Sequence, residues 1–464
     1  MSYSTQSETG NDLFDGVSID KTTALQSKLH QAAVSDPGRQ FHALYDKLYL
    51  PYVLETALAL VKRNDGAPGI DGQTIKSLAE YGEVRFIEET AKQLREKTYR
   101  PEPARRVTIP KNGDRTKLRP LGIPTVRDRM VQAAAKLVLE PIFEADFEGC
   151  SFGFRPGIGQ HDALEAISQN AKDGFRHVVD GDIEQFFDSL DHQELMAALR
   201  RRISDGAMLR LIYFWLKAGY ILDGEYHDTD QGSPQGGVLS PLLANVYLHA
   251  FDRASRTQKS FIGRLTRYAD DFVIQCGSRT QAEKALAWAA EQLTKLKLRL
   301  HPEKTKLVND REEGFDFLGF HHRRVLIRYG KAMGKESYGV LRWPSAKACA
   351  QFRAKVKERL GPPGRIRGRW KEILEAYARF LRGWWQYFRH GNSYRVFCKL
   401  DYYARERLAR NLARSQPKGE KRSKRRWTFY AAHEGMKQVA RLTAFSKEDA
   451  RYYHGPVKAG WRAV

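Results

Sequence analysis

The sequence has few cysteines, no long apolar run and a deficit of acidic residues. Its four cysteines, Cys150, Cys276, Cys349 and Cys398, are scattered along 464 residues and form no C-x-x-C pair. This spacing disfavours a disulfide scaffold or a zinc site and fits a reducing compartment. No stretch approaches the roughly 18 apolar residues of a membrane span, and the polar beginning lacks the apolar segment of a secretory signal. We therefore expect a cytoplasmic protein with no membrane partner.

The chain is strongly basic. Lysine and arginine total 78 against 55 aspartates and glutamates, which gives a formal net charge of +23. Such an excess favours a polyanionic partner, and nucleic acid is the first candidate because aromatic residues are interleaved with the charges. A hydrophobic content of 42% over this length is enough for two or three domains. We expect a location associated with the nucleoid.

Acidic residues gather at two predicted strand ends. The segment 264–276 reads as strand, tight turn and strand, and the turn carries Asp270 and Asp271. A second apolar strand, from residue 176 onward, ends at Asp182 and is followed by Phe186-Phe187. Taken alone, an Asp-Asp turn is more often a solvated hairpin. If the two strands lie side by side in one sheet, however, the three carboxylates converge.

Three converging carboxylates suit one kind of chemistry. Mg²⁺ takes oxygen ligands and keeps positions open for water and substrate phosphates. Two such ions can stabilise the attacking and the leaving oxygen of a phosphoryl displacement. Asp182, Asp270 and Asp271 are therefore the candidate catalytic residues of a nucleotidyl transferase.

Two further segments are candidates for nucleotide contacts. Residues 105–119 read as a basic hairpin with an Asn-Gly tip; such a tip can fold over a triphosphate, or it can simply be a solvated hairpin. Residues 231–241 are rich in glycine and contain Gln235, and Ser240 is expected to cap the helix that follows. A helix over 127–140 is expected to end before Pro141.

The element pattern predicts an α+β fold in the first two thirds of the chain and helices beyond. Residues 170–320 alternate strands and helices around an antiparallel centre. After a composition shift near 334–345, three amphipathic helices are expected. We expect four parts: an extension over 1–45, fingers and palm over 46–330, a helical thumb over 340–415, and a short basic segment over 416–464.

These motifs resemble those of the reverse transcriptase–maturase proteins encoded by bacterial group II introns. Tyr268-Ala-Asp-Asp271 resembles the polymerase box of that family, and Asp182–Asp188 resembles its first metal-binding motif. Ser233-Pro-Gln-Gly-Gly237 is similar to its nucleotide-proximal motif. Arg119–Pro124 and Ser151–Pro156 resemble its fingers motifs, and the region around Arg382-Gly-Trp384 resembles its thumb, or maturase, signature.

The resemblance implies a right-hand polymerase fold with fingers, palm and thumb, and it implies roles for single residues. Two Mg²⁺ ions would be held by Asp182, Asp270 and Asp271, with the carbonyl of Ile183 as a further ligand. Phe187 would exclude ribonucleotides at the sugar 2′ position. The remaining nucleotide contacts implied by the resemblance are Lys111 and Arg119 on the triphosphate, Gln235 on the incoming nucleotide, and Lys304 near the leaving pyrophosphate.

The implied function is RNA-directed DNA polymerisation together with binding of the group II intron RNA, assistance in its splicing and copying of the intron during retrohoming. The partners would be intron RNA, an RNA template, a DNA primer or target, and dNTPs; the sequence does not indicate the oligomeric state. Many relatives end in a His- and Cys-rich HNH endonuclease domain. The segment after Gln416 has no cysteine and only His433 and His454, so no such domain is expected. Two alternatives remain: a splicing maturase without polymerase activity, and a related polymerase recruited to phage defence or CRISPR.

Overall fold

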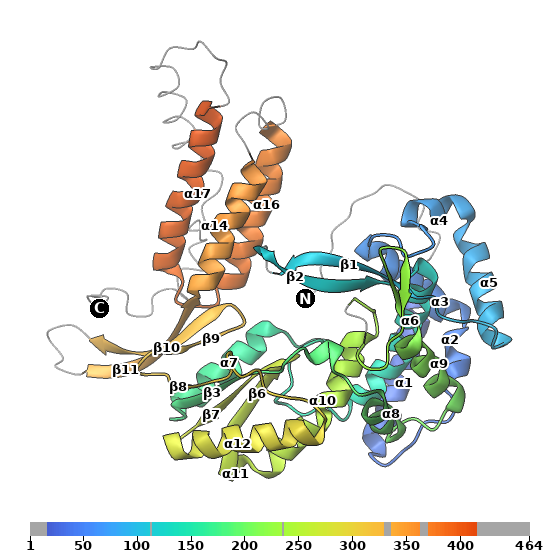
Figure 1. Ribbon diagram of the computed structural model, residues 1–464, viewed down its shortest axis with the longest axis horizontal. Coiled ribbons are helices and arrows are strands. Elements are labelled where there is room, and N and C mark those ends of the chain that lie inside the picture. The colour runs from blue at the N-terminus through green and yellow to red at the C-terminus, as the bar shows by residue number, and fades with distance from the viewer. Residues whose placement is uncertain (1–15, 112–113, 234–235, 329–335, 362–369, 415–464) are drawn as a thin grey trace.

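The computed structural model describes residues 16–111, 114–233, 236–328, 336–361 and 370–414 (Figure 1). The α+β arrangement expected from the sequence is confirmed, with sheets as far as Pro344 and three long helices after it. Among the described helices, none is long and apolar enough to cross a membrane. The division into four parts at the expected boundaries stays a prediction.

A helical layer forms the first part of the chain. Its centre is α3, which begins with Pro51 at a position where the missing N–H is not needed and buries one apolar stripe. Helices α1 and α6 pack against α3 and against each other. The helices of this layer are α1 (Gly16–Ser35), α2 (Tyr45–Leu48), α3 (Pro51–Asn64), α4 (Ile75–Tyr81), α5 (Glu83–Arg95) and α6 (Val126–Glu144).

The prediction that the helix over 127–140 ends before Pro141 is wrong, because α6 continues to Glu144 with Pro141 inside it. Proline cannot donate to the carbonyl four residues earlier, that of Leu137. Here the side chain of Gln26, on α1, donates to the Leu137 carbonyl at 3.1 Å. His30 of the same helix contacts the Pro141 carbonyl at 3.0 Å. Tertiary contacts with α1 therefore compensate for the proline.

The fingers sheet has the strand order β2-β1-β4-β5. β1 (Ala104–Lys111) and β2 (Asp114–Ile123) form the antiparallel basic hairpin expected from the sequence. β4 (Tyr220–Leu222) runs parallel to β1 and pairs with β5 (Glu225–His227).

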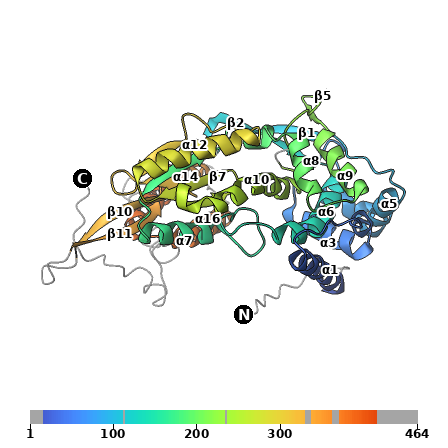
Figure 2. The same cartoon turned by 90° about the horizontal axis from the view of Figure 1, so that it is seen from below.

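The palm sheet has the order β6-β7-β3-β8, and all of its neighbours are antiparallel. Helices α10 and α12 contact each other, and α12 packs on β3 and β7 (Figure 2). α7 contacts β6 and β7. The elements of the palm are α7 (Gln160–Lys172), β3 (His177–Asp182), α10 (Ser240–Thr257), α11 (Lys259–Ile262), β6 (Arg264–Tyr268), β7 (Asp271–Cys276), α12 (Arg279–Lys295) and β8 (Lys306–Asn309).

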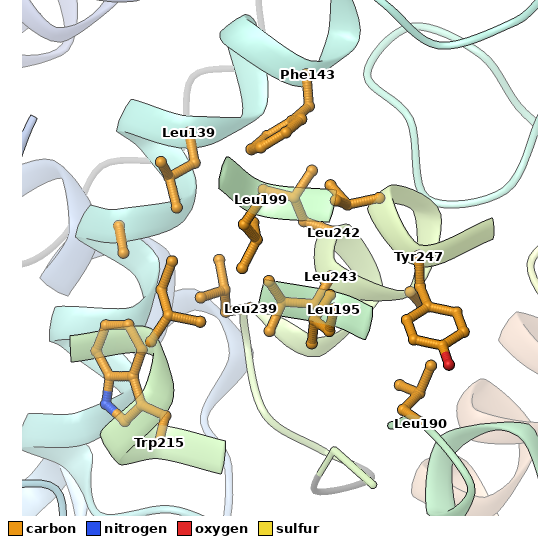
Figure 3. Close-up of a cluster of buried hydrophobic side chains, with 14 of the residues drawn as sticks. Leu139, Phe143, Leu190, Leu195, Leu199, Trp215, Leu239, Leu242, Leu243 and Tyr247 are labelled. Carbon is orange, nitrogen blue, oxygen red and sulfur yellow. The ribbon is translucent and has the colours of Figure 1, made fainter. Parts of the chain in front are cut away.

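The junction between the helical layer and the palm is an apolar core. A short 3₁₀ helix (Phe186–Asp188) leads into α8 (His192–Arg200) and α9 (Gly206–Lys217). Side chains from α6, α8, α9 and α10 meet there, and Figure 3 shows Leu139, Leu199, Leu243 and Trp215 among them. Because these helices share one core, the elements that carry the fingers sheet and the palm sheet are held together.

A third sheet precedes the helices near the end of the chain. β9 (Phe315–Phe317), β10 (Phe320–Arg328) and β11 (Glu336–Pro344) form an antiparallel sheet in the order β11-β10-β9, and the long β10–β11 hairpin was not anticipated from the sequence. Three helices follow, α14 (Ala346–Leu360), α16 (Trp370–Phe388) and α17 (Tyr394–Arg414), as expected. Phe320, Phe352 and Phe397 are buried in one core with Val178 and Val273 of the palm sheet. This shared core places the three helices beside the palm, as Figure 1 shows.

Candidate active site

Strand pairing brings together two of the three predicted catalytic aspartates. β3 and β7 are antiparallel neighbours in a register that sets Asp182 directly opposite Asp271. Directly opposed residues of such a pair have Cβ atoms about 5 Å apart. Asp270 lies in the turn between β6 and β7, immediately before Asp271, the first residue of β7. The convergence predicted from the sequence, on a sheet with these strands side by side, is therefore present in the backbone.

The turn itself has an unusual backbone. Ala269 has a φ of 57°, a left-handed conformation that residues with a Cβ seldom adopt. The loop 150–155 lies directly against it: a Cβ on Gly153 would come within 2.4 Å of the Ala269 backbone nitrogen. The amide of Phe152 donates to the Arg267 carbonyl at 2.9 Å. The segment Ser151–Pro156, which resembles a fingers motif of the family, thus packs against the aspartate turn.

A lysine faces the carboxylate of Asp182. Lys304 Nζ donates to Asp182 Oδ1 at 2.8 Å. The chain after α12 is held there because the His301 amide donates to the Asp182 carbonyl at 2.8 Å and because Leu300 bridges to Ile183. Lys304 therefore lies at the carboxylates, where the resemblance implied a role beside the pyrophosphate.

Negative charge is concentrated at this edge of the sheet. Burial, followed by repulsion from Asp270 and Asp182, raises the pKa of Asp271 to about 6, while Lys304 and Lys347 oppose the rise. Lys347 belongs to the first turn of α14, so a thumb residue contributes to the electrostatics of the palm. Such mutual repulsion is what a bound cation relieves.

Asp180 is an acidic neighbour that sequence analysis did not single out. It lies two residues before Asp182 and therefore on the same face of β3. Burial, then repulsion from Asp271 and Asp316, raises its pKa to about 7, with Lys306 opposing. The signal for this residue was present in the sequence as a second carboxylate at a spacing of two in the same strand.

The predicted nucleotide side is only partly described. Phe187 is half-buried, and its carbonyl accepts from the Ser233 amide at 2.8 Å. Arg119 is exposed on β2. Gln235 lies outside the described residues, and so does the side chain of Lys111.

The loop that contains Gln235 contacts both the palm and the fingers. A Cβ on Gly232 would meet the Asp188 carbonyl at 2.9 Å, and one on Gly236 would meet the Gly122 carbonyl at 2.4 Å. The prediction that Ser240 is the N-cap of α10 is wrong, because Ser240 is the first residue of the helix. Its hydroxyl accepts a hydrogen bond from the Ser233 hydroxyl at 2.8 Å. The loop is therefore fixed at both ends, between the 3₁₀ helix of Phe187 and the end of β2.

Arg155, the arginine of the aromatic loop, has an internal role. Its guanidinium pairs with Glu144 at 2.6 Å and donates to the carbonyls of Glu148 and Ser151. The side chain is largely buried by these contacts, so it fastens the loop to α6.

The carboxylates fit a divalent cation in their chemistry. Hard divalent cations prefer carboxylate and carbonyl oxygens, which is the donor set offered by Asp182, Asp270 and Asp271. Among the residues that the structure describes, no three His, Cys, Asp or Glu side chains are grouped as a ready metal site. The Lys304 ammonium in contact with Asp182 marks the position as one that favours a cation.

Two family models match parts of the chain. Residues 109–322 match the family described as reverse transcriptase (RNA-dependent DNA polymerase), and residues 349–430 match the group II intron, maturase-specific domain. Protein YkfC of Escherichia coli (strain K12) is 37% identical over 349 residues, which cover 66% of this chain and 90% of YkfC.

A second relative is the group II intron-encoded protein LtrA of Lactococcus lactis subsp. cremoris, 33% identical over 370 residues. The match covers 65% of this chain and 60% of LtrA, so the chain spans less than two thirds of that protein. Among solved structures, a chain of a partial Cas6-RT-Cas1–Cas2 complex is similar with 25% identity and a TM-score of 0.34, over 55% of this chain and 43% of that one.

Proposed function

Because the chain belongs to the reverse transcriptases that carry a group II intron maturase domain, we propose that it copies RNA into DNA with two Mg²⁺ ions held by Asp182, Asp270 and Asp271. Members of the family use divalent metal ions. The observation that carries the proposal is the register that sets Asp182 opposite Asp271, with Asp270 beside it. Carboxylates distant in the sequence converge at the edge of one sheet, as this chemistry requires.

The residues of this edge have separate roles in the proposal. The three aspartates, with the Ile183 carbonyl, hold the ions. When bound, the ions stabilise charge on the attacking and leaving oxygens of a phosphoryl displacement. Lys304, which contacts Asp182 at 2.8 Å, would donate to the leaving pyrophosphate. The raised pKa of Asp271 supports the assignment, because it reflects a local excess of negative charge.

The incoming dNTP lies between the palm and the fingers in this proposal. Phe187 closes off the sugar 2′ position, Lys111 and Arg119 bind the triphosphate, and Gln235 contacts the nucleotide. Support comes from the residues on either side of the segment that contains Gln235: Gly232 lies against Asp188, next to Phe187, and Gly236 lies against Gly122 near the end of β2. Elements held in fixed positions around a substrate can orient it for reaction.

The RNA partner in the proposal is the group II intron, which the protein binds, helps to splice and copies into target DNA at the nucleoid. The maturase-specific match over residues 349–430 and the net charge of +23 support this assignment. Phosphate contacts of this kind predict an affinity that falls steeply with salt.

Primer extension on an RNA template tests the proposal. Asp270→Ala is expected to abolish dNTP incorporation while retaining affinity for the primer–template. Glu291→Gln is the matched control, because Glu291 is an exposed carboxylate whose ion pair, with Lys295, lies within α12. Extension by Asp270→Ala at the wild-type rate would overturn the assignment. Splicing without any extension by the wild type would favour a maturase that lacks polymerase activity.

A further inference from the structure

Arg267 lies beneath the aspartate turn and is fully buried. It is on β6, three residues before Asp270. Its guanidinium has five N–H donors, and all five have partners. Nε and Nη2 donate to the two carboxylate oxygens of Asp252, the former at 2.7 Å. The other partners are the side-chain oxygen of Asn245 at 3.1 Å, the hydroxyl of Ser151 at 2.7 Å and the carbonyl of Ala269 at 2.8 Å.

The bond to Ala269 is the one that reaches the candidate site. The Ala269 carbonyl belongs to the peptide unit that leads into Asp270, so its orientation sets where the two aspartates begin. Ala269 has a φ of 57°, and a residue with a Cβ keeps such a conformation only when its surroundings hold it. The buried Arg267 guanidinium stabilises this conformation through its hydrogen bond to the Ala269 carbonyl.

The partners of Arg267 are themselves fixed. Asn245 and Asp252 lie two turns apart on the same face of α10. The side-chain amide of Asn245 donates to the Gly153 carbonyl at 2.7 Å, and the backbone N–H of Arg267 donates to the Cys150 carbonyl at 2.8 Å. α10, the loop 150–153 and the aspartate turn are thereby joined through one guanidinium.

Stability alone is a weak reason for such a pair. A buried ion pair is often replaceable by apolar residues of similar volume without loss of stability, because desolvation offsets the attraction between the charges. Burial alone would lower the pKa of Arg267, and the Asp252 carboxylate reverses that effect and raises it. The guanidinium therefore stays charged and keeps all of its donors, including the one that holds Ala269.

We propose that Arg267 is a positioning residue that sets the metal-binding geometry of Asp270 and Asp271 through the Ala269 carbonyl. This inference rests on the proposed function, because it assigns the turn a divalent cation. Residues that orient metal ligands without touching the metal typically change metal affinity or activity by about 10- to 100-fold when they are replaced.

The test is the double variant Arg267→Met/Asp252→Leu, which removes both charges together and leaves no unpaired buried ion. Its matched control is Arg324→Met/Asp310→Leu, a second largely buried pair in which the guanidinium donates to the Ala171 carbonyl. Asp310 follows Asn309, which pairs with His177. His177 is the first residue of β3 and Asp182 is the last, so the control pair lies at the other end of this strand. At about 3.4 Å per residue, the control pair lies roughly 17 Å from the site.

Two readouts separate positioning from folding. Mn²⁺ binding, followed by electron paramagnetic resonance without nucleic acid or dNTP, is expected to weaken about 10- to 100-fold in Arg267→Met/Asp252→Leu. The Mg²⁺ midpoint of primer extension should rise by the same factor, while primer–template affinity stays within about twofold. The control pair should leave both metal midpoints at the wild-type value.

A folded Arg267→Met/Asp252→Leu protein with wild-type metal midpoints would overturn the inference. If this variant does not fold, Asn245→Ala replaces it. That change keeps the ion pair with Asp252 but removes one hydrogen-bond partner of the guanidinium and the hydrogen bond to the Gly153 carbonyl. A metal midpoint raised less than about threefold in Asn245→Ala would overturn the inference. Asp271→Ala in the same titrations distinguishes a failure of the proposed function from a failure of the positioning role of Arg267. Unchanged metal binding and extension in Asp271→Ala would refute the proposed function itself, whereas a loss there beside wild-type behaviour of Arg267→Met/Asp252→Leu would refute only the positioning role.

Discussion

Replacing Asp271 by asparagine should lower activity and raise stability together. The side chain keeps its shape but loses its charge, and that charge is unfavourable in the folded protein because burial and the neighbouring Asp270 and Asp182 raise the pKa of Asp271 to about 6. A rise of about two pH units from the ordinary value corresponds to about 3 kcal/mol. Although its carboxyl group is largely desolvated, Asp271 as a residue keeps an exposed side, so screening by solvent reduces this to about 1 kcal/mol.

The sign of the effect fixes its pH dependence. The folded carboxyl binds a proton more readily than the unfolded one, so the wild type loses this free energy above about pH 6 and recovers it as the pH falls toward 4. In the presence of EDTA, Asp271→Asn should therefore be more stable than the wild type by about 1 kcal/mol at pH 8, with no gain near pH 4. Urea unfolding at the two pH values measures both quantities.

The same variant should lose at least about 100-fold in primer extension, since about 1.4 kcal/mol of lost transition-state stabilisation corresponds to a tenfold change in rate and a metal supplies several kcal/mol. Asp173→Asn is the matched control, because its carboxylate is held by Arg264 at 2.5 Å, which lowers its pKa, so its loss should not stabilise the protein. A loss of stability in Asp271→Asn at pH 8, or full activity, would refute the reasoning.

Three further predictions concern single residues. Lys304→Met should slow single-turnover dNTP incorporation by about 100-fold, since a positioned donor at a developing charge has that value, and an unchanged rate would remove Lys304 from the site. Phe187→Ala should raise incorporation of rNTP relative to dNTP by roughly tenfold, because a steric barrier is lost, and an unchanged ratio measured on one template would contradict its assigned role. His322 is buried with both ring nitrogens unpartnered, and burial lowers its pKa to about 3. Below pH 6.5 the unfolded chain therefore binds a proton that the folded protein does not, and the folded protein loses stability. His322→Phe should consequently gain about 2 kcal/mol more over the wild type at pH 5 than at pH 8 in urea unfolding, and equal gains at the two pH values would refute the assignment.

The positions of the three carboxylates at strand ends could be predicted from the sequence because each depends only on neighbouring residues. Asp182 ends an apolar run, and Asp270 and Asp271 interrupt another, so each strand end could be located without knowing the fold. The pairing of β3 with β7 then follows from packing two apolar strands in one antiparallel sheet. The helices over 346–360 and 394–414 were predictable for a similar reason, since each carries its own apolar stripe.

Contacts between distant segments were not predictable in this way. Arg267 is an ordinary strand arginine in the sequence, and its burial depends on Asp252 and Asn245 of α10, which only the fold brings beneath it. Pro141 remains inside α6 because Gln26 of another helix donates to the carbonyl that proline leaves free. The β10–β11 hairpin was missed because residues 334–345 were interpreted as a composition shift before the helices, whereas Glu336–Pro344 form β11.

The most direct measurement is anomalous diffraction from Mn²⁺ in crystals of the protein with an RNA template, a DNA primer and a non-hydrolysable dNTP. We predict ions coordinated by Asp182, Asp270 and Asp271 together, with Lys304 released from Asp182 toward the phosphates. Ions bound elsewhere, or a density in which Asp182 coordinates none of them, would contradict the assignment of these carboxylates to nucleotidyl transfer.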